Sequence, residues 1–233
     1  MISMRKINAL VAKDMKTTLN NIFVLSGLLA VPIMGLLLSI GSEPEQLIAL
    51  ASFLVPMNVL LNGANIICVM IAEEKEKHTL NVLVASTVSG ADFLVSKVVV
   101  TALFAFVSNA LVYAILRLGG VMPFGPFLLV TGVTILPVAV VGAIIGIACK
   151  TQAAASTAVA PIMILLVILP PLIPENYFTE NILRFVFSES MTHGLSAVYS
   201  GEPFLAEIGI IAANFVVLAA VFWAVYRKKG LVG

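Results

Sequence analysis

Five consecutive charged side chains stand between two of the longest apolar runs of this 233-residue chain. They are Glu73, Glu74, Lys75, Glu76 and Lys77. Each Glu or Lys costs about 2.5–3.5 kcal/mol at the centre of a bilayer, so we expect the cluster at a water-facing surface. Leu80, Leu83 and Val84 follow at helical spacing, which predicts a short amphipathic helix along the interface. Such a segment is either a solvated loop between two membrane spans or a docking element for a soluble partner.

Three asparagines, Asn58, Asn62 and Asn65, recur at i, i+4 and i+7 in the apolar run before this cluster. They share one helix face, which lipid would penalise and which should therefore point at protein or water. Our first interpretation is interhelical hydrogen bonding, and the second is a polar lining for a transport pathway. Such a lining permits a polar or amphipathic cargo without selecting one, so drug, peptide, lipid and ion all stay open.

Catalytic motifs are absent from the sequence, which has no GxxxxGK[ST], HExxH or GxSxG pattern and no paired aspartates in an apolar run. We therefore expect no enzymatic activity and no cofactor in this chain. His78 and His193 fall on opposite sides of the membrane in a six-span topology, so we expect no metal site. The basic residues lie at helix ends and form no continuous patch, which argues against nucleic-acid binding.

Composition places the chain in a membrane. Hydrophobic residues make up 61% of it and charged residues only 11%, more apolar surface than a soluble domain of this length can bury. A spanning helix needs about 20 largely apolar residues, which leaves room for six spans with short connections. The predicted fold is an all-α integral membrane protein with a single transmembrane domain over residues 1–233. The expected spans are 22–41, 46–72, 93–116, 127–149, 153–173 and 208–226.

Three segments flank these spans. Residues 1–21 place basic residues among apolar ones at near-helical spacing, which predicts an amphipathic helix in the headgroup plane. Residues 73–90 form the short helix and loop already described. Residues 174–207 are acidic but contain an apolar patch, which fits either short helices that dip back into the bilayer or a simple surface helix.

Single residues within the spans carry further expectations. Gly142 and Gly146 form a GxxxG pair that permits close helix approach. Lys97 lies about one turn inside the third span, so we expect its long side chain to extend back to the lipid phosphates. Asp92 stands where an N-cap would begin that helix.

The distribution of basic residues predicts the orientation. With both termini in the cytoplasm, the outer loops hold only Arg117 and Arg184 of the 13 Lys and Arg residues. This skew is what the positive-inside rule requires of six spans with both ends inside. The charged stretch after the second span then faces the cytoplasm, and the acidic segment 174–207 faces outward.

With these features the chain resembles the type-2 ATP-binding-cassette (ABC) transporter permeases. The resemblance rests on the amphipathic N-terminal segment, the six spans, and a glutamate pair that leads into a short helix after the second span. The matching residues are Glu73, Glu74, Lys75, Glu76 and Thr79 to Leu83, followed by Val88, Ser89 and Lys97. The connection from Pro170 to Glu207 is similar to the re-entrant helices of that family, and it is shorter than in members built around large outer domains.

The resemblance implies a function and partners. In that family the charged segment is the coupling helix, which fits a cleft on a separate cytoplasmic ATPase. Glu73, Glu74, Lys75, Glu76, Lys77, Thr79, Leu80 and Leu83 would form this interface, with the leucines as its hydrophobic seat and the charged residues as its polar rim. Two ATPase subunits, which bind ATP and Mg, and a second permease subunit would complete an exporter in the cell membrane. The short outer region favours a small prokaryotic exporter, and homodimer and heterodimer both stay open.

A second hypothesis from another class is a non-transporting membrane scaffold or immunity-type protein that recruits a soluble partner. A neighbouring gene for an ATPase with a Walker A motif would favour the exporter over the scaffold.

Overall fold

The computed structural model describes residues 4–77, 90–173 and 182–229, and within these ranges the chain is helical and contains no strand. The helices are α1 (Met4–Leu19), α2 (Ile22–Ser39), α3 (Pro44–Glu76), α5 (Gly90–Ile115), η1 (Leu118–Gly120), α6 (Phe124–Ala148), α7 (Gln152–Leu172), η2 (Leu183–Phe185), α9 (Phe187–Ser200) and α10 (Leu205–Lys229). Six of them, α2, α3, α5, α6, α7 and α10, are long and apolar enough to cross a membrane. The expected all-α membrane fold with six spans is confirmed.

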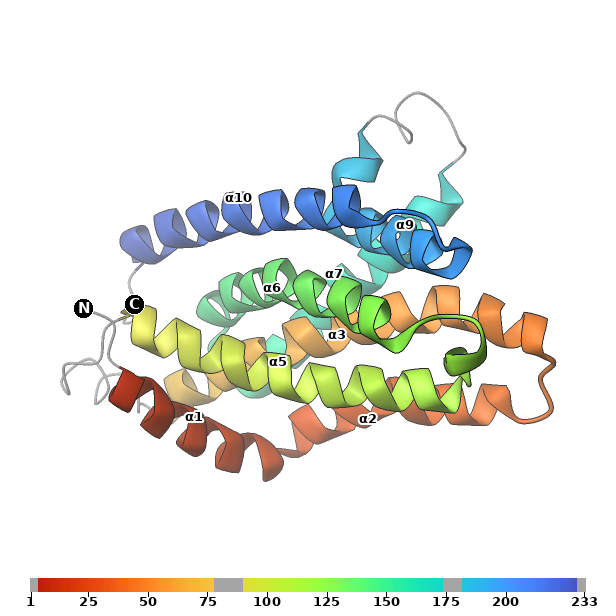
Figure 1. Ribbon diagram of the computed structural model, residues 1–233. Helices are drawn as coiled ribbons and strands as arrows, with labels where there is room; N and C mark the ends of the chain where they lie inside the picture. Colours follow the sequence, from red (N-terminus) through yellow and green to blue (C-terminus); the bar gives the residue numbers. More distant parts are fainter. Residues whose placement is uncertain (1–3, 78–89, 174–181, 230–233) are drawn as a thin grey trace.

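Helix α3 is the centre of the bundle. In its most apolar window 89% of the residues are buried, against 17% for α10 and 22% for α7. At about 1.5 Å per residue its 33 residues extend for roughly 50 Å, well beyond a hydrocarbon layer of about 30 Å. Its neighbours α2, α5 and α6 run alongside it (Figure 1). A displacement of α3 would therefore change its packing against most of the other helices in the bundle.

The bounds of α3 differ from the expected span 46–72, whereas the other five membrane helices agree with expectation within three residues at each end. At the N-terminal end, Glu43 and Gln46 form a reciprocal capping box around Pro44, which starts the helix earlier. At the C-terminal end the helix continues through Glu76. The expected short helix and loop over residues 73–90 therefore do not include residues 73–76, which belong to α3, and residues 78–89 lie outside the described residues.

Close packing of α3 against α6 explains the GxxxG pair. A Cβ at Gly142 would lie 2.7 Å from Ile67 Cγ2, and one at Gly146 would lie 2.9 Å from the carbonyl oxygen of Cys68. Only glycine at these two positions lets the helices approach this closely. The expectation of close approach is confirmed, and the partner helix is α3.

The segment between α7 and α10 contains the short helix α9. Its 14 residues extend for about 21 Å, too little to cross a bilayer, and its apolar face is buried against α6 and α10. Arg184 Nη2 lies 2.7 Å from Glu207 Oε1 and ties η2 to the start of α10. That α9 re-enters the bilayer stays a prediction.

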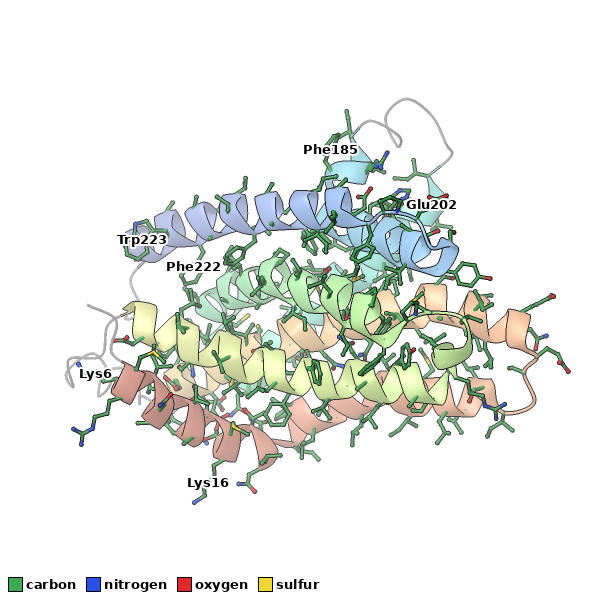
Figure 2. The ribbon with its side chains drawn as sticks, in the orientation of Figure 1. Lys6, Lys16, Phe185, Glu202, Phe222 and Trp223 are labelled. Atoms are coloured by element: carbon green, nitrogen blue, oxygen red, sulfur yellow. The ribbon has the colours of Figure 1, made fainter. Side chains whose placement is uncertain are left out.

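The two ends of the bundle differ in their side chains. Lys6 and Trp223 lie toward the end where α1 begins and α10 finishes, and Phe185 and Glu202 lie toward the other end (Figure 2). The start of α1 and the finish of α10 lie toward the same end of the bundle, as expected for an even number of spans (Figure 1).

Candidate functional site

Ten charged and polar side chains, five of them buried, meet where α3 ends. We call this set the charged junction. Its members are Lys13, Asp14, Asn21, Glu73, Glu74, Lys75, Glu76, Lys77, Lys97 and Gln152. They come from α1, the start of α2, the last turn of α3, the first part of α5 and the start of α7. One cluster therefore joins five helices.

Lys97 is the innermost charge of the junction. Its side chain is only 1% exposed, and its Nζ lies 2.8 Å from Glu74 Oε1 and 3.3 Å from each carboxylate oxygen of Asp14. The ammonium also stands 4.6 Å from the centroid of the Phe93 ring. A buried charge is tolerated only when it is paired, and two carboxylates supply that pairing here. The expectation that Lys97 extends to lipid phosphates is wrong, because its partners lie inside the protein.

Asp14 brings α1 into the junction. It is 3% exposed and lies on the buried face of α1 with Ile7, Leu10 and Thr18. Burial raises the pKa of the Asp14 carboxyl above its ordinary 3.8, and Lys97 acts in the opposite direction. A desolvated carboxylate and a desolvated ammonium thus hold α1 against α5.

Glu73 and Asn21 connect α3 to α2 and α7. Asn21 Nδ2 donates to Glu73 Oε2 at 2.8 Å and to Gln152 Oε1 at 2.6 Å. The Oδ1 of the same side chain accepts from the backbone N–H of Phe23 at 3.0 Å and so caps α2. One asparagine therefore fixes the start of α2 against the ends of two other helices.

The last turn of α3 also holds the turn between α6 and α7. Glu76 Oε2 accepts from the backbone N–H of Gln152 at 2.9 Å. Lys75 Nζ donates to the carbonyl oxygen of Ile147 near the end of α6. These bonds provide hydrogen-bond partners for backbone groups that have none within their own helix, because they lie at helix ends.

These contacts change the role expected of the first charged residues. Glu73 and Glu74 are 6% and 5% exposed and bind within the chain, so the expectation that they face water is wrong, and their place in the polar rim of an ATPase interface stays a prediction. Lys77, whose side chain is 59% exposed, pairs with Glu73 and still faces water. The other three expected contacts, Thr79, Leu80 and Leu83, lie outside the described residues.

Sequence reasoning missed the roles of Asp14, Asn21 and Lys97. A signal for Asp14 existed, because it falls in register with Ile7, Leu10 and Thr18 on the mostly apolar stripe of α1. An acidic residue on such a stripe needs a buried partner. Asp92 was expected to cap α5, but the helix begins at Gly90 and Asp92 stands in its first turn.

Comparison with known families decides the identity of this fold. A family model described as ABC-2 family transporter protein matches residues 8–226. The chain belongs to the ABC-2 family. It is a multi-pass membrane permease of the ABC transporter type, a transport component of a family that works with an ABC ATPase and is generally not catalytic. No curated protein matches the sequence.

The three asparagines of this ABC-2 permease are buried in α3. Asn58 Nδ2 donates to Asn109 Oδ1 at 2.6 Å, and Asn62 Nδ2 donates to Ser108 Oγ at 3.0 Å, so both side chains bond α3 to α5. Asn65 Nδ2 reaches the carbonyl oxygen of Phe23 in α2 at 3.4 Å. These bonds favour interhelical hydrogen bonding over a pathway lining.

Proposed function

We propose that this permease is the membrane subunit of an ATP-driven exporter. Two cytoplasmic ATPase subunits would supply the energy, and a second permease subunit would complete the pathway. The charged junction carries the proposal, because it lies directly before residues 78–89, the remainder of the segment that the family resemblance assigns to the coupling helix. The chain itself has no Walker A motif, so the energy must come from a partner.

The charged junction bonds three helices together, so the partner could move them as one unit. Residues 78–89 join the last turn of α3 to the start of α5, and the same two helices are bonded through Glu74 and Lys97. Lys13 adds α1, since its Nζ lies 2.8 Å from Glu74 Oε1. A push on the connecting segment would therefore shift α1, α3 and α5 together, and α3 would carry the motion into the bundle.

The proposed orientation places the junction in the cytoplasm. Basic residues gather there, and the positive-inside rule assigns such an end to the cytoplasmic face. Both termini then lie inside, and α9 lies toward the outer face.

Copurification tests the coupling assignment. Leu83→Asp should abolish copurification of the ATPase, because a charge replaces the proposed hydrophobic seat. Leu83→Met keeps an apolar side chain of similar volume and should retain the ATPase. Equal recovery of ATPase with both variants, at equal levels of inserted permease, would contradict the proposal.

A second assay separates the exporter from a non-transporting scaffold. Glu74→Gln removes the carboxylate that Lys13 and Lys97 share, and Glu74 is too buried to form an exposed contact with a partner. The exporter predicts that the ATPase still copurifies but that its ATP turnover in the complex changes. A scaffold predicts turnover identical to that of the unaltered complex.

A further inference from the structure

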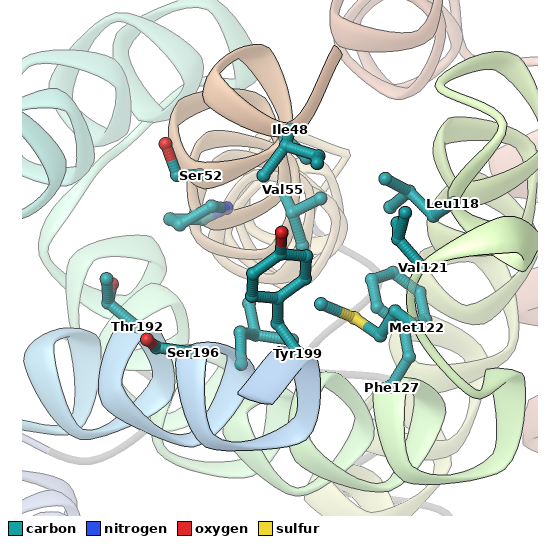
Figure 3. A pocket seen from close by; sticks show the side chains of 13 residues that line it. Ile48, Ser52, Val55, Leu118, Val121, Met122, Phe127, Thr192, Ser196 and Tyr199 are labelled. Carbon is teal, nitrogen blue, oxygen red and sulfur yellow. The ribbon is translucent and has the colours of Figure 1, made fainter. Parts of the chain in front are cut away.

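A cavity of about 220 Å³ lies beside the N-terminal third of α3, at the opposite end of that helix from the charged junction. One face of α3 and one face of α9 form its long sides, and the η1 turn with the start of α6 borders it at one end. Figure 3 shows the Tyr199 ring and the Met122 side chain reaching toward the middle of the space, with Ser52 and Thr192 on its margin. An engineered apolar cavity of about 150 Å³ binds benzene, so this one accommodates a larger molecule.

The sequence of the two facing helices leaves this space open. The lining positions of α9 are Thr192, Leu195, Ser196 and Tyr199, spaced i, i+3, i+4 and i+7, so they form one continuous face. Ala51 and Ser52 on α3 and Thr192 and Ser196 on α9 are small, where leucines would close a packed interface. Val121 and Tyr199 are 37% and 47% exposed, so the cavity opens to the surface on this side and a ligand can enter it without unfolding the bundle.

The lining determines the chemistry of that ligand. None of the 13 lining residues is Asp, Glu, Lys, Arg or His, so a charged ligand would find no counter-ion. The Ser52 hydroxyl donates to the carbonyl oxygen of Ala49 at 2.8 Å, and the Thr192 hydroxyl donates to that of Ser188 at 3.2 Å. Each hydroxyl proton is thus already in a hydrogen bond. The lone pairs of each hydroxyl oxygen remain and can accept a hydrogen bond from a donor on the ligand.

We propose that this cavity is a binding site for an uncharged amphipathic molecule with a body of about one ring and a short chain, and with a hydroxyl or amide N–H donor. The apolar body lies among Val55, Leu195 and Met122, and the donor meets Ser52 or Thr192. A second cavity of about 330 Å³ shares Ser52, Pro56 and Thr192 as lining residues, and its lining also contains Glu189, so the apolar body of the ligand belongs in the first cavity. The site does not depend on the proposed coupling to an ATPase.

Photolabelling of the full-length permease in detergent tests the site. The probe is a phenol that carries a photoreactive diazirine on a short alkyl chain. Labelling should saturate and map to residues 48–56 and 192–199. Because the donor matters, 4-butylphenol should compete at least tenfold better than butylbenzene.

Two variants distinguish this cavity from general partition into detergent or lipid. Ser196→Leu fills the space and should lower labelling at least tenfold, whereas Ser200→Leu makes the same change at the last residue of α9, which is not among the lining residues, and should leave it unaltered. Ser52→Ala combined with Thr192→Val removes both acceptor hydroxyls and should remove the preference for 4-butylphenol over butylbenzene.

Three results would overturn the proposal. They are equal labelling of the Ser196→Leu and Ser200→Leu proteins, unsaturable labelling spread over α2 and α10, and competition by phospholipid as strong as by 4-butylphenol. Recovery of the ATPase with Ser196→Leu is measured in parallel and should be unchanged, so failure here is distinct from failure of the proposed coupling.

Discussion

The two ends of α3 are held in opposite ways. At the C-terminal end, ion pairs and hydrogen bonds fix the helix to five neighbours, α1, α2, α5, α6 and α7, and Gly142 and Gly146 bring α6 into backbone contact. At the N-terminal end, small side chains face α9 across an unfilled cavity. Helix α3 is thus held by polar contacts at the end where the proposed ATPase acts and by looser apolar contacts at the other end.

The contrast shows how a single long helix can serve two purposes. Charged contacts with fixed geometry resist sliding, because a shift that separates a buried pair exposes an uncompensated charge. The helices around the cavity are held by apolar contacts, so they can shift relative to one another without breaking ion pairs or hydrogen bonds. We therefore expect substitutions to cost most at the junction and progressively less away from it.

The largest effect should follow from Lys97→Met. This change leaves Asp14 without its closest cation in the described part of the chain, and breaking a buried pair typically costs about 3–5 kcal/mol. Titration with SDS, followed by circular dichroism, measures the loss of unfolding free energy. Lys16→Met, an exposed position on α1, is the matched control and should change stability by less than about 0.5 kcal/mol. Equal stability of the two variants would contradict a special role for the junction.

Next should come Gly142→Ala. Its Cβ would meet Ile67 and the backbone of Ala64, so α3 and α6 must move apart, at a cost of about 1–3 kcal/mol. Gly132→Ala in the same helix meets no atom within 4 Å and serves as the control. The thermal midpoint in detergent should fall for the first variant and stay level or rise slightly for the second. A fall of similar size in both would indicate that the helix approach is not tight.

A smaller effect, about 1 kcal/mol, is expected for Asn62→Leu, because hydrogen bonds between membrane helices contribute modestly. The variant loses the bonds to Asn58 and Ser108 but keeps the same number and branching of side-chain heavy atoms. Stability should fall while the selectivity among exported compounds stays the same. A change of selectivity without loss of stability would instead support a pathway lining.

The smallest effect concerns acid stability. Burial raises the pKa of Asp14 above 3.8, so just above that pH the folded chain retains a proton that the unfolded chain has released. This group therefore makes stability fall as the pH rises through that window. Asp14→Asn does not titrate and should flatten the pH dependence there, as measured by unfolding at a series of pH values. An unchanged slope would mean that Asp14 titrates normally.

Much of this fold follows from the sequence, because twenty-residue apolar runs have few alternatives to a spanning helix. The close approach at Gly142 and Gly146 also follows from the sequence, although its partner helix does not. The charged junction was harder to predict. Glu73 and Glu74 look exposed next to three other charges, and only the fold brings Asp14 and Lys97, 83 residues apart, to the same point. Long-range pairing of this kind leaves no local pattern apart from a charge on an apolar stripe.

The orientation of α3 is the most direct test of the account, since the junction can meet a cytoplasmic motor only from inside the cell. In a background with Cys68→Ala and Cys149→Ala, cysteines are placed at Glu45 or Lys77, at the two ends of α3. A thiol reagent that does not cross membranes should label Glu45→Cys in intact cells and Lys77→Cys only after permeabilisation. Labelling of Lys77→Cys in intact cells would contradict the account.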